Sequence, residues 1–441
     1  MTKASKLLMA VLPAIVTTVA AQGKQALTLQ EAITRAERVQ PRVVQAMNQV
    51  RTADARIRSS KGAYLPNLNL STTGSEVYSE GQTLNPVTQQ FAPAGATTTS
   101  VNGSLNTQVE LFDGFRRGAE SRAARANQES AIESLEDARF QQQLTTTNQF
   151  FDVLAATQLV RVREASVRRA EEQLRASIAR LRAGAAIRSD SLRSLVTLGN
   201  ARVQLLNAQT QLATAEANLG RLVGSDQPVA AVDDSAFYRI VADLDSTGLR
   251  IEALNRAPQV RSAEATARSA RAAIGVARAG YYPTLALSAS GSVSGSQQAI
   301  ALGDPQTEFK FRQQRQAALT VTWPIFNRFT REQNISNQLA TADNAEATAG
   351  ETRRLVLANL TTRLAELDAA RVRTGIAQTS LAAATEDLRV QQERYRLGVA
   401  TIVDVVTSQE SLAQAEVDAV TVRFDHLRAK AQIQALIGRQ L

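Results

Sequence analysis

The chain of 441 residues contains no cysteine and a single histidine, His426. Without cysteine it can form no disulfide, no thiolate metal site and no lipid linkage through an N-terminal cysteine. A lone histidine within a helical pattern is more often packed than functional. The sequence also lacks a phosphate-binding loop and a carboxylate cluster with metal-ligand spacing. We therefore expect no enzymatic activity, no metal site and no cofactor.

Aromatic residues and clustered charge are also scarce. Aromatics make up 4% of the chain, and the formal net charge of +9 comes from arginines interleaved with Glu, Gln and Ala. Nucleic-acid-binding proteins gather positive charge on one surface and often use aromatic rings as stacking platforms. The charge is better explained as solvated helix surface, and no nucleic-acid partner is expected.

The one long hydrophobic run lies at the N-terminus. Lys3 and Lys6 precede the apolar stretch 7–19, and Val19-Ala20-Ala21 supplies small residues before an expected cleavage at Gln22. These features predict a secretory signal peptide at residues 1–21. The run is shorter than the ~20 residues of a transmembrane helix, and no later run approaches that length. We expect the protein to leave the cytoplasm, and any passage through a membrane would have to be made by a β-barrel.

The second half of the chain repeats the first at an offset of 214 residues, measured from Gly184 to Gly398. The matching runs are Arg180 to Ala186 with Arg394 to Ala400, Leu111-Phe112 with Ile325-Phe326, and Leu222-Val223-Gly224 with Leu436-Ile437-Gly438. This period is far longer than the ~20–50 residues of a solenoid unit. The sequence therefore predicts two structural repeats, residues 22–224 and 248–441, joined by a linker at residues 225–247.

Helix-forming residues dominate both repeats. The expected helices are residues 28–63, 116–182 and 189–222 in the first repeat, and residues 248–280, 329–396 and 402–437 in the second. At ~1.5 Å per residue, the long helix of each repeat would span roughly 100 Å, which two shorter helices stacked end to end would match. Leucines recur every seven residues, as at Leu198 and Leu205, which indicates coiled-coil packing. Gly184 and Gly398 fall at the expected turns, so each repeat should end in a helical hairpin.

Between the helices lie segments in which apolar and polar residues alternate, for example residues 101–111. The expected strands are residues 66–77 and 98–112, and residues 283–294 and 315–326, joined by polar loops at 78–96 and 295–313. Pro66 and Pro283 stand where strands begin, as proline allows, and Phe112 and Trp323 stand near strand ends. We interpret Trp323 as an aromatic residue at a membrane boundary.

The alternation has two explanations. Alternation over ~10 residues is typical of outer-membrane strands, but a half-buried strand of a soluble sheet has the same pattern and is more common. Export and the long helices favour the membrane strand. Four strands cannot close a barrel alone, because the smallest single-chain barrels have about eight, so several copies would have to share one. The expected fold is mainly α with a transmembrane β portion.

The motifs together resemble those of the TolC-like outer-membrane factors, the exit ducts of efflux pumps and type I secretion systems. The resemblance covers essentially the whole mature chain and rests on Tyr64 with Pro66, Tyr281 with Pro283, residues 111–115, and the run 395–405. It implies a homotrimer in the outer membrane, with a shared twelve-stranded β-barrel and a long α-helical barrel in the periplasm. The linker 225–247 would contribute to an equatorial belt around the helices.

The resemblance also implies a gate at the hairpin tips. The position of Asp404 forms a periplasmic constriction ring in the family, and a second family aspartate one turn further on is Thr407 here. Tyr395 and Asp190 match a tyrosine and an aspartate that hold the family's closed state, whereas the matching arginine position is Ala400. The arginines considered as substitutes are Arg188, Arg394 and Arg396. The alternative is that Asp190 and Asp404 simply cap the returning helices.

Partners follow from the same resemblance. The tips near Gly184 and Gly398 would meet a periplasmic adaptor and an inner-membrane transporter, which would open the duct and choose its passenger, while the strands would meet outer-membrane lipid. The alternative function is a periplasmic coiled-coil adaptor or scaffold without a pore. The four alternating segments discriminate between the two, because a scaffold has no need of them.

Overall fold

The computed structural model describes residues 25–84, 89, 91–238, 245–300 and 310–439. The predicted signal peptide, residues 1–21, lies outside these residues. The helices are α1 (Leu29–Val39), α2 (Pro41–Gly62), α3 (Arg116–Arg182), α4 (Arg188–Val223), α5 (Ser246–Arg256), α6 (Pro258–Arg278), α7 (Thr330–Arg396) and α8 (Ile402–Ile437). The strands are β1 (Gln25–Leu27), β2 (Asn67–Leu84), β3 (Phe91–Phe112), β4 (Val229–Ala231), β5 (Thr284–Ile300) and β6 (Lys310–Thr322).

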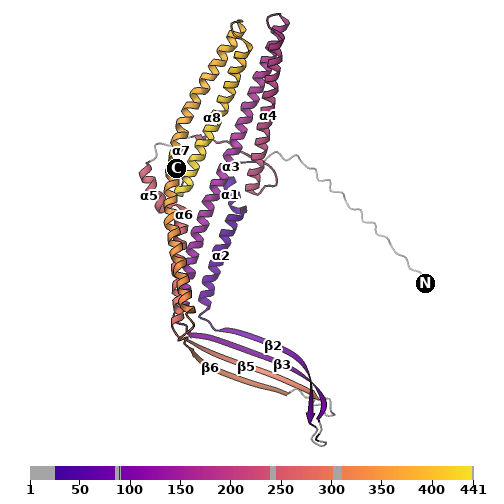
Figure 1. Cartoon of the computed structure of the whole chain (residues 1–441), viewed down its shortest axis with the longest axis vertical. Coiled ribbons are helices and arrows are strands. Elements are labelled where there is room, and N and C mark those ends of the chain that lie inside the picture. The colour runs from indigo at the N-terminus through magenta and orange to yellow at the C-terminus, as the bar shows by residue number, and fades with distance from the viewer. Residues whose placement is uncertain (1–24, 85–88, 90, 239–244, 301–309, 440–441) are drawn as a thin grey trace, which may run out of the picture.

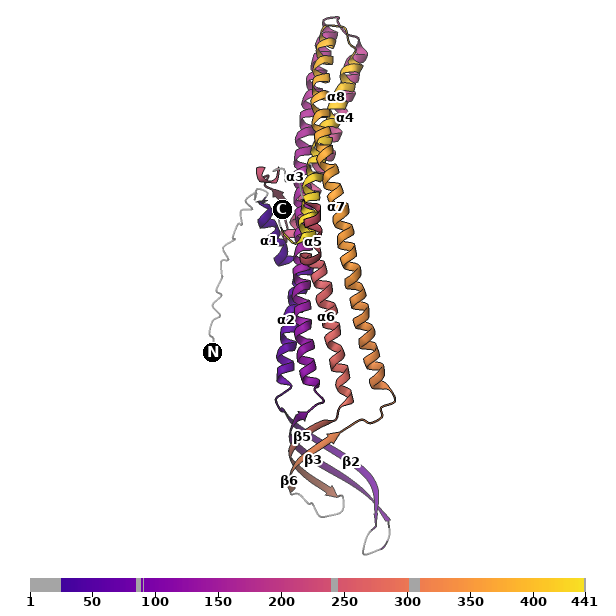
Figure 2. The same cartoon turned by 90° about the vertical axis from the view of Figure 1, so that its left-hand side faces the viewer.

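The molecule is a long rod of helices with a sheet at one end and two hairpin tips at the other (Figure 1). Helices α3 and α7, of 67 residues each, run the full length of the rod. In the half next to the sheet they pack with α2 and α6, and in the other half with α4 and α8 (Figure 2). Two shorter helices therefore match each long one, as the helix lengths predict.

Two of the expected helices are each broken by a proline, so the prediction of single helices at 28–63 and 248–280 was wrong. Helix α1 ends before Gln40, which is extended, and α2 begins at Pro41. In the same way, extended Ala257 separates α5 from Pro258, the first residue of α6. Proline has no N–H to continue a helix and forces the preceding residue out of the helical region, but it is well suited to start a new helix.

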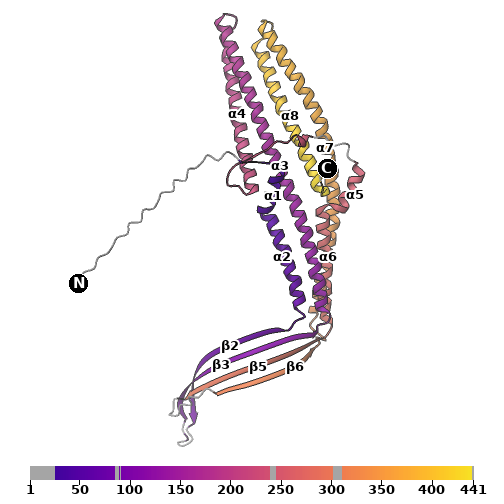
Figure 3. The ribbon, with the colours of Figure 1, turned by 180° about the vertical axis from the view of Figure 1, so that it is seen from behind.

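The four long strands form one antiparallel sheet in the order β2-β3-β5-β6, which leaves β2 and β6 as its edges (Figure 3). The strands extend further than expected. The described parts of the two predicted loops, residues 78–96 and 295–313, are largely strand, because β2 pairs with β3 as far as Leu84 and Phe91, and β5 pairs with β3 as far as Ile300. Residues 85–88, 90 and 301–309 of these loops lie outside the described residues. Backbone pairing satisfies polar residues as well as apolar ones in an antiparallel ladder. In the other direction β6 stops at Thr322 rather than at 326, because Pro324 cannot donate to a ladder.

The sheet has one polar and one apolar face. Ser71 and Ser104 share a hydrogen bond of 2.7 Å on the polar face, and Ser75 and Ser100 share another. The opposite face carries exposed aliphatic side chains from all four strands, namely Leu68, Leu70, Val101, Leu105, Leu287, Val293, Leu319 and Val321. A β-bulge between Glu110 and Phe112 pairs Phe112 with Leu285, which places Phe112 on the apolar face.

The main core lies at mid-length of the rod. Phe150 and Phe151 of α3 pack with Leu219 of α4 and Phe424 of α8. From the predicted linker, residues 235–238 form a short 3-10 helix, and its Phe237 meets the rings of Phe150 and Phe151 edge-on. Strands β1 and β4 pair beside this core. Smaller clusters join α5 and α6 to α7 and α8, and hold the tip of the α7–α8 hairpin.

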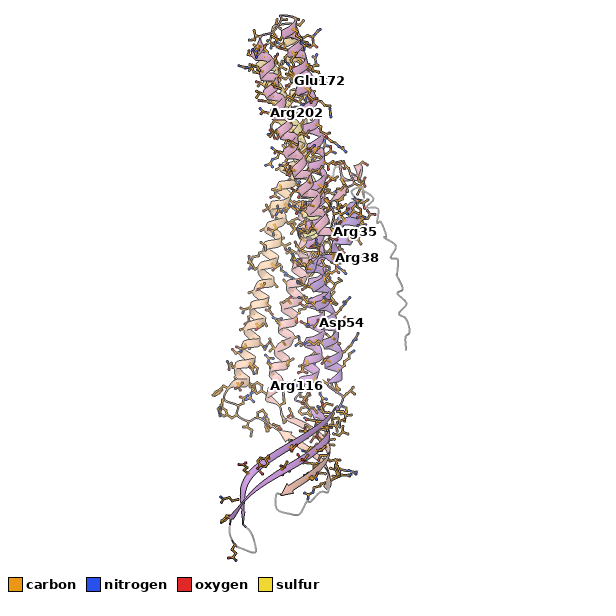
Figure 4. All side chains as sticks on the ribbon, turned by 90° about the vertical axis from the view of Figure 1, so that its right-hand side faces the viewer. Arg35, Arg38, Asp54, Arg116, Glu172 and Arg202 are labelled. Carbon is orange, nitrogen blue, oxygen red and sulfur yellow. The ribbon has the colours of Figure 1, made fainter. Side chains whose placement is uncertain are left out.

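Charged side chains project from the outside of the rod along much of its length (Figure 4). Arg38 on α1 and Glu172 and Arg202 on the α3–α4 hairpin are examples, and all three are exposed. None of the described helices combines the length and the apolar character needed to span a bilayer.

Candidate functional site at the hairpin tips

Both hairpins turn through a glycine in the left-handed region, Gly184 with φ of 71° and Gly398 with φ of 80°. The backbone N–H of Ala185 donates to the carbonyl of Arg180 (2.9 Å), and that of Val399 donates to the carbonyl of Arg394 (2.9 Å). These are the bonds of a Schellman motif, in which glycine avoids the penalty of a Cβ. No atom lies within 4 Å of a Cβ added to either glycine, so backbone conformation alone demands it.

Asp404 caps the start of α8. Its Oδ2 accepts hydrogen bonds from the backbone N–H of Thr401 (2.7 Å) and from the Thr401 hydroxyl (2.8 Å). In return, the N–H of Asp404 donates to the Thr401 hydroxyl (3.3 Å), which completes a capping box. The alternative of helix capping is thus confirmed for Asp404. Because both bonds to the carboxylate use Oδ2, capping leaves the exposed Asp404 side chain its charge and its second oxygen.

The cap also fixes the ionisation of Asp404. The hydrogen bond from the Thr401 backbone, followed by that from the Thr401 hydroxyl, holds the pKa of Asp404 below its ordinary value of 3.8. The carboxylate is therefore negative throughout the neutral range. Thr407, one turn further along α8, is exposed as well. Asp190 occupies the first turn of α4 but makes no capping bond from its side chain.

Tyr395 is buried at the end of α7, with 8% of its surface exposed. The guanidinium of Arg180, on α3, lies 4.3 Å above the centre of its ring and donates to its backbone carbonyl. The pKa of Tyr395 is raised, chiefly by burial. The positive charge of Arg180 acts against this shift, and the negative charge of Asp190 adds to it. The tips of the two hairpins therefore meet at Arg180 and Tyr395. Among the described residues, the buried hydroxyl of Tyr395 has no hydrogen-bond partner, so Asp190 does not bond it.

The arginine in this contact is none of the three considered from the sequence. Arg396 pairs with Glu393 (2.9 Å), Arg394 donates to Gln391 (3.4 Å), and Arg188 is exposed. The repeat itself contains the missing signal, because Arg180 is the residue that corresponds to Arg394 at the offset of 214. Ala400, at the family's arginine position, packs against the apolar cluster of the α7–α8 tip.

Below the tips, the seam between α3 and α8 joins the two hairpins. Arg169 makes a two-pronged ion pair with Glu416, with N–O distances of 3.0 and 2.6 Å. Their side chains are only 23% and 19% exposed, so the pair is partly shielded from water. Closer to the core, Arg428 bonds Asp152 (2.7 Å). This seam was not predicted from the sequence. The repeat does contain a signal for it, because Glu416 corresponds to Arg202 at the offset of 214 and the charge therefore changes sign between the two halves.

The junctions between sheet and helices are built alike in both repeats. Pro66 and Pro283 directly precede β2 and β5, whereas Phe112 ends β3 and Trp323 follows β6. The indole N–H of Trp323 donates to the carbonyl of Tyr281 (3.2 Å).

Each junction also stacks an arginine on a tyrosine. Arg117 lies 4.6 Å above the ring of Tyr64, and Arg331 lies 4.1 Å above that of Tyr281. Each junction therefore fixes the direction in which a long helix leaves the sheet.

The lone histidine lies on α8 and is half-buried. Burial, and after it the charges of Lys430 and Arg371, lower the pKa of His426, which favours the neutral imidazole. Among the residues that the structure describes, no three histidine or carboxylate side chains are placed to bind a metal.

A model of the family described as outer membrane efflux protein matches residues 24–225 and, separately, residues 249–439. These two matches cover most of the chain. The chain belongs to the outer membrane efflux protein family. This efflux protein is accordingly located in the outer membrane. The family model matches once in each half of the duplicated chain.

Known proteins similar to this efflux protein include two curated relatives. It is 26% identical over 316 residues to the pyoverdine export outer membrane protein OpmQ of Pseudomonas aeruginosa, a match that covers 70% of this chain but 65% of that protein. It is 24% identical over 343 residues to the cobalt-zinc-cadmium resistance protein CzcC of Cupriavidus metallidurans, covering 78% of each chain. The fold is that of a solved CusC structure, with a TM-score of 0.74 at 18% identity and coverage of 93% of this chain and 92% of CusC.

Proposed function

We propose that three copies of this efflux protein form a passive export duct, which is the outer-membrane exit of a tripartite efflux pump or a type I secretion system. One observation carries the proposal. The four-stranded sheet has an exposed apolar face, a polar face and two unpaired edges, β2 and β6. Lipid does not tolerate open strand edges, so the edges must be closed by further copies. Three copies would give a twelve-stranded barrel with its polar face towards a water-filled pore.

The helices would continue this barrel as a second, α-helical one that ends at the hairpin tips. In a trimer, the exposed and ionised Asp404 would appear three times around the axis, and such a ring attracts cations. The contact of Arg180 with Tyr395 would hold the tips of each copy together in the closed state. A periplasmic adaptor and an inner-membrane transporter, meeting the turns at Gly184 and Gly398, would then release the tips.

The passenger would be chosen by the transporter rather than by the duct. The names of the relatives differ in what is exported or resisted, pyoverdine for OpmQ and cobalt, zinc and cadmium for CzcC. The function needs no catalytic group, because the duct lowers no chemical barrier. The alternative, a periplasmic scaffold without a pore, leaves the sheet and its apolar face without a purpose.

Purification and conductance test this function together. The protein, extracted from outer membranes in detergent, should run as a trimer that dissociates only on heating, and it should form discrete cation-selective channels in planar bilayers. A soluble periplasmic monomer, or a membrane trimer without conductance at any applied voltage, would reject the duct.

A further inference from the structure

Opposite charges stand on the apolar face at the two edge strands: Glu76 and Glu80 on β2, and Arg315 on β6. The Glu80 carboxylate accepts a hydrogen bond from the Tyr78 hydroxyl (3.4 Å), which leaves Glu76 and Arg315 to be explained. The register links Leu70 to Leu105, Leu105 to Gly291 and Gly291 to Arg315, so Arg315 of β6 is on the same face as Leu70 and Leu105. Glu76 of β2 lies an even number of residues beyond Leu70 and therefore shares that face. Both charged side chains are exposed.

Among the described residues, neither Glu76 nor Arg315 has a partner within its own chain. In the part that the structure describes, Glu76 and Arg315 form no hydrogen bond and no ion pair. The residue opposite Arg315 on β5 is Gly291, and the residue opposite Glu76 on β3 is Thr99. Charges on the lipid-facing side of an outer-membrane strand are destabilising, so both side chains need a counter-charge.

The two residues lie at similar distances along their strands from the end of the sheet that adjoins the helices. Arg315 is seven residues from the end of β6 at Thr322, and Glu76 is nine residues from the start of β2 at Asn67, with both of these strand ends next to the helices. If β6 and β2 were neighbours, the two side chains would be offset by about two residues. That offset is the spacing of a diagonal cross-strand pair, with Cβ atoms ~7–8 Å apart or less, which long side chains bridge.

We propose that, where the β6 edge of one copy meets the β2 edge of the next in the proposed duct, Arg315 forms an ion pair with Glu76 of the neighbouring copy. This inference rests on the proposed oligomeric duct and names the charge pair that sets its seam. Strand directions alternate from β2 to β6, so the new pair is antiparallel like the pairs within the chain. The seam then joins two free edges and neutralises two lipid-facing charges at once.

Charge exchange tests the pair in the full-length trimer. Arg315→Glu and Glu76→Arg should each lower the temperature at which the trimer dissociates in detergent, because each places two like charges at the seam. The double variant Glu76→Arg/Arg315→Glu should restore most of the loss. Arg312→Glu is the matched control, because Arg312 lies on the same strand but opposite Ser294 on the polar face, and its dissociation temperature should stay near that of the wild type.

Cross-linking locates the contact directly, since the chain has no cysteine of its own. A Glu76→Cys/Arg315→Cys variant treated with a short bismaleimide should give covalent dimers and trimers, whereas Glu76→Cys/Arg312→Cys should give few.

The outcomes separate this inference from the proposed function. A stable conducting trimer without the 76–315 cross-link, or one in which the double exchange brings no recovery, overturns the seam pair but leaves the duct intact. A loss seen only with Arg315→Glu, as expected if the guanidinium binds a lipid phosphate, overturns it too. A monomeric wild-type protein rejects the duct itself.

Discussion

At the residue scale, Asp404 shows how one carboxylate can have a local and a proposed collective role. Its Oδ2 closes a capping box with Thr401, and the side chain remains exposed and ionised. Removing the whole side chain would therefore confuse a lost cap with a lost charge. An asparagine separates them, because its amide oxygen can still accept from the Thr401 N–H.

We expect Asp404→Asn to lower the cation selectivity of the channel. The thermal stability of the trimer should fall only slightly, because asparagine keeps an acceptor for the Thr401 N–H but loses the charge of the cap. Reversal potentials in a salt gradient measure the selectivity. Asp404→Glu keeps the charge and should stay selective. Unchanged selectivity in Asp404→Asn would remove Asp404 from the gate and leave it as a helix cap.

The same residue predicts a pH dependence. Because the folded-state pKa of Asp404 lies below its ordinary 3.8, the ionised cap stabilises the tip at all pH values above that range. This stabilisation, and the proposed negative ring, should both be lost as the pH falls through the lowered pKa. Selectivity that titrated near neutral pH instead would point to another group.

Arg180 joins the two hairpin tips of one copy. Arg180→Ala removes the cation above the Tyr395 ring and the donor to its carbonyl, so we expect the channel to open more often in single-channel recordings. Arg394→Ala removes the repeat counterpart, which donates a long hydrogen bond to Gln391 (3.4 Å) and, in the described part of the chain, does not bridge the two tips, so it should change little. Equal effects of both substitutions would show that general loss of tip charge, rather than this contact, matters.

At the scale of elements, the seam between α3 and α8 changes character along its length. Phe151 and Phe424 pack near mid-length, whereas Arg169 and Glu416 form an ion pair closer to the tips. An apolar contact is not directional and tolerates small changes in the angle between the helices. A two-pronged ion pair, by contrast, requires one relative orientation of its two side chains. The two hairpins are therefore held together by apolar packing at the core and by a directional ion pair near the tips.

Glu416→Gln should destabilise the contact between the two hairpins by about 1–3 kcal/mol, since it removes a charged acceptor from a partly shielded guanidinium. Hydrogen exchange over residues 169–182 and 402–416, together with thermal unfolding, measures the loss. Glu171→Gln breaks the more exposed pair with Arg202, at 60% and 40% side-chain exposure, and should cost less than about 1 kcal/mol. Equal losses would mean that Arg169 and Glu416 are no more than a surface pair.

At the junction of β3 with α3, the close approach of Tyr282 and Ala279 requires a glycine at position 114. Gly114 has φ of 66°, and an added Cβ would lie 2.7 Å from Cβ of Tyr282 and 2.8 Å from the carbonyl oxygen of Ala279. The following residue, Phe115, is also left-handed at 67°, and so is Phe329 at 61° in the second repeat. For a bulky residue this conformation is strained, and its recurrence in both repeats indicates that the exit from the sheet requires it.

At the scale of the whole molecule, length is the feature most open to measurement. Helix α3 has 67 residues and, at ~1.5 Å per residue, spans roughly 100 Å. Electron microscopy of the trimer in lipid nanodiscs should therefore show a stalk of about that length on one side of the bilayer. A stalk of half that length would mean that the hairpins fold back in the assembled protein.

Local signals fixed much of the molecule from the sequence alone. The bounds of α3 and α8 coincide with the expected residues 116–182 and 402–437, because helix propensity and glycine-terminated ends act within a few residues. The breaks at Pro41 and Pro258 were equally local and could have been predicted. The capping box of Asp404 with Thr401 is likewise a short-range motif.

Only the tertiary structure decided what depends on contacts between distant segments. The strands continue into polar residues because a partner strand lies alongside, which alternation in one segment cannot reveal. Arg180 meets Tyr395, and Arg169 meets Glu416, only because the two repeats pack against each other. The sequence determined the elements and their duplication, because these follow from short-range backbone preferences. Packing between the two repeats decided which of the repeat-related residues, such as Arg180 rather than Arg394, makes the contact, because that depends on segments far apart in the chain.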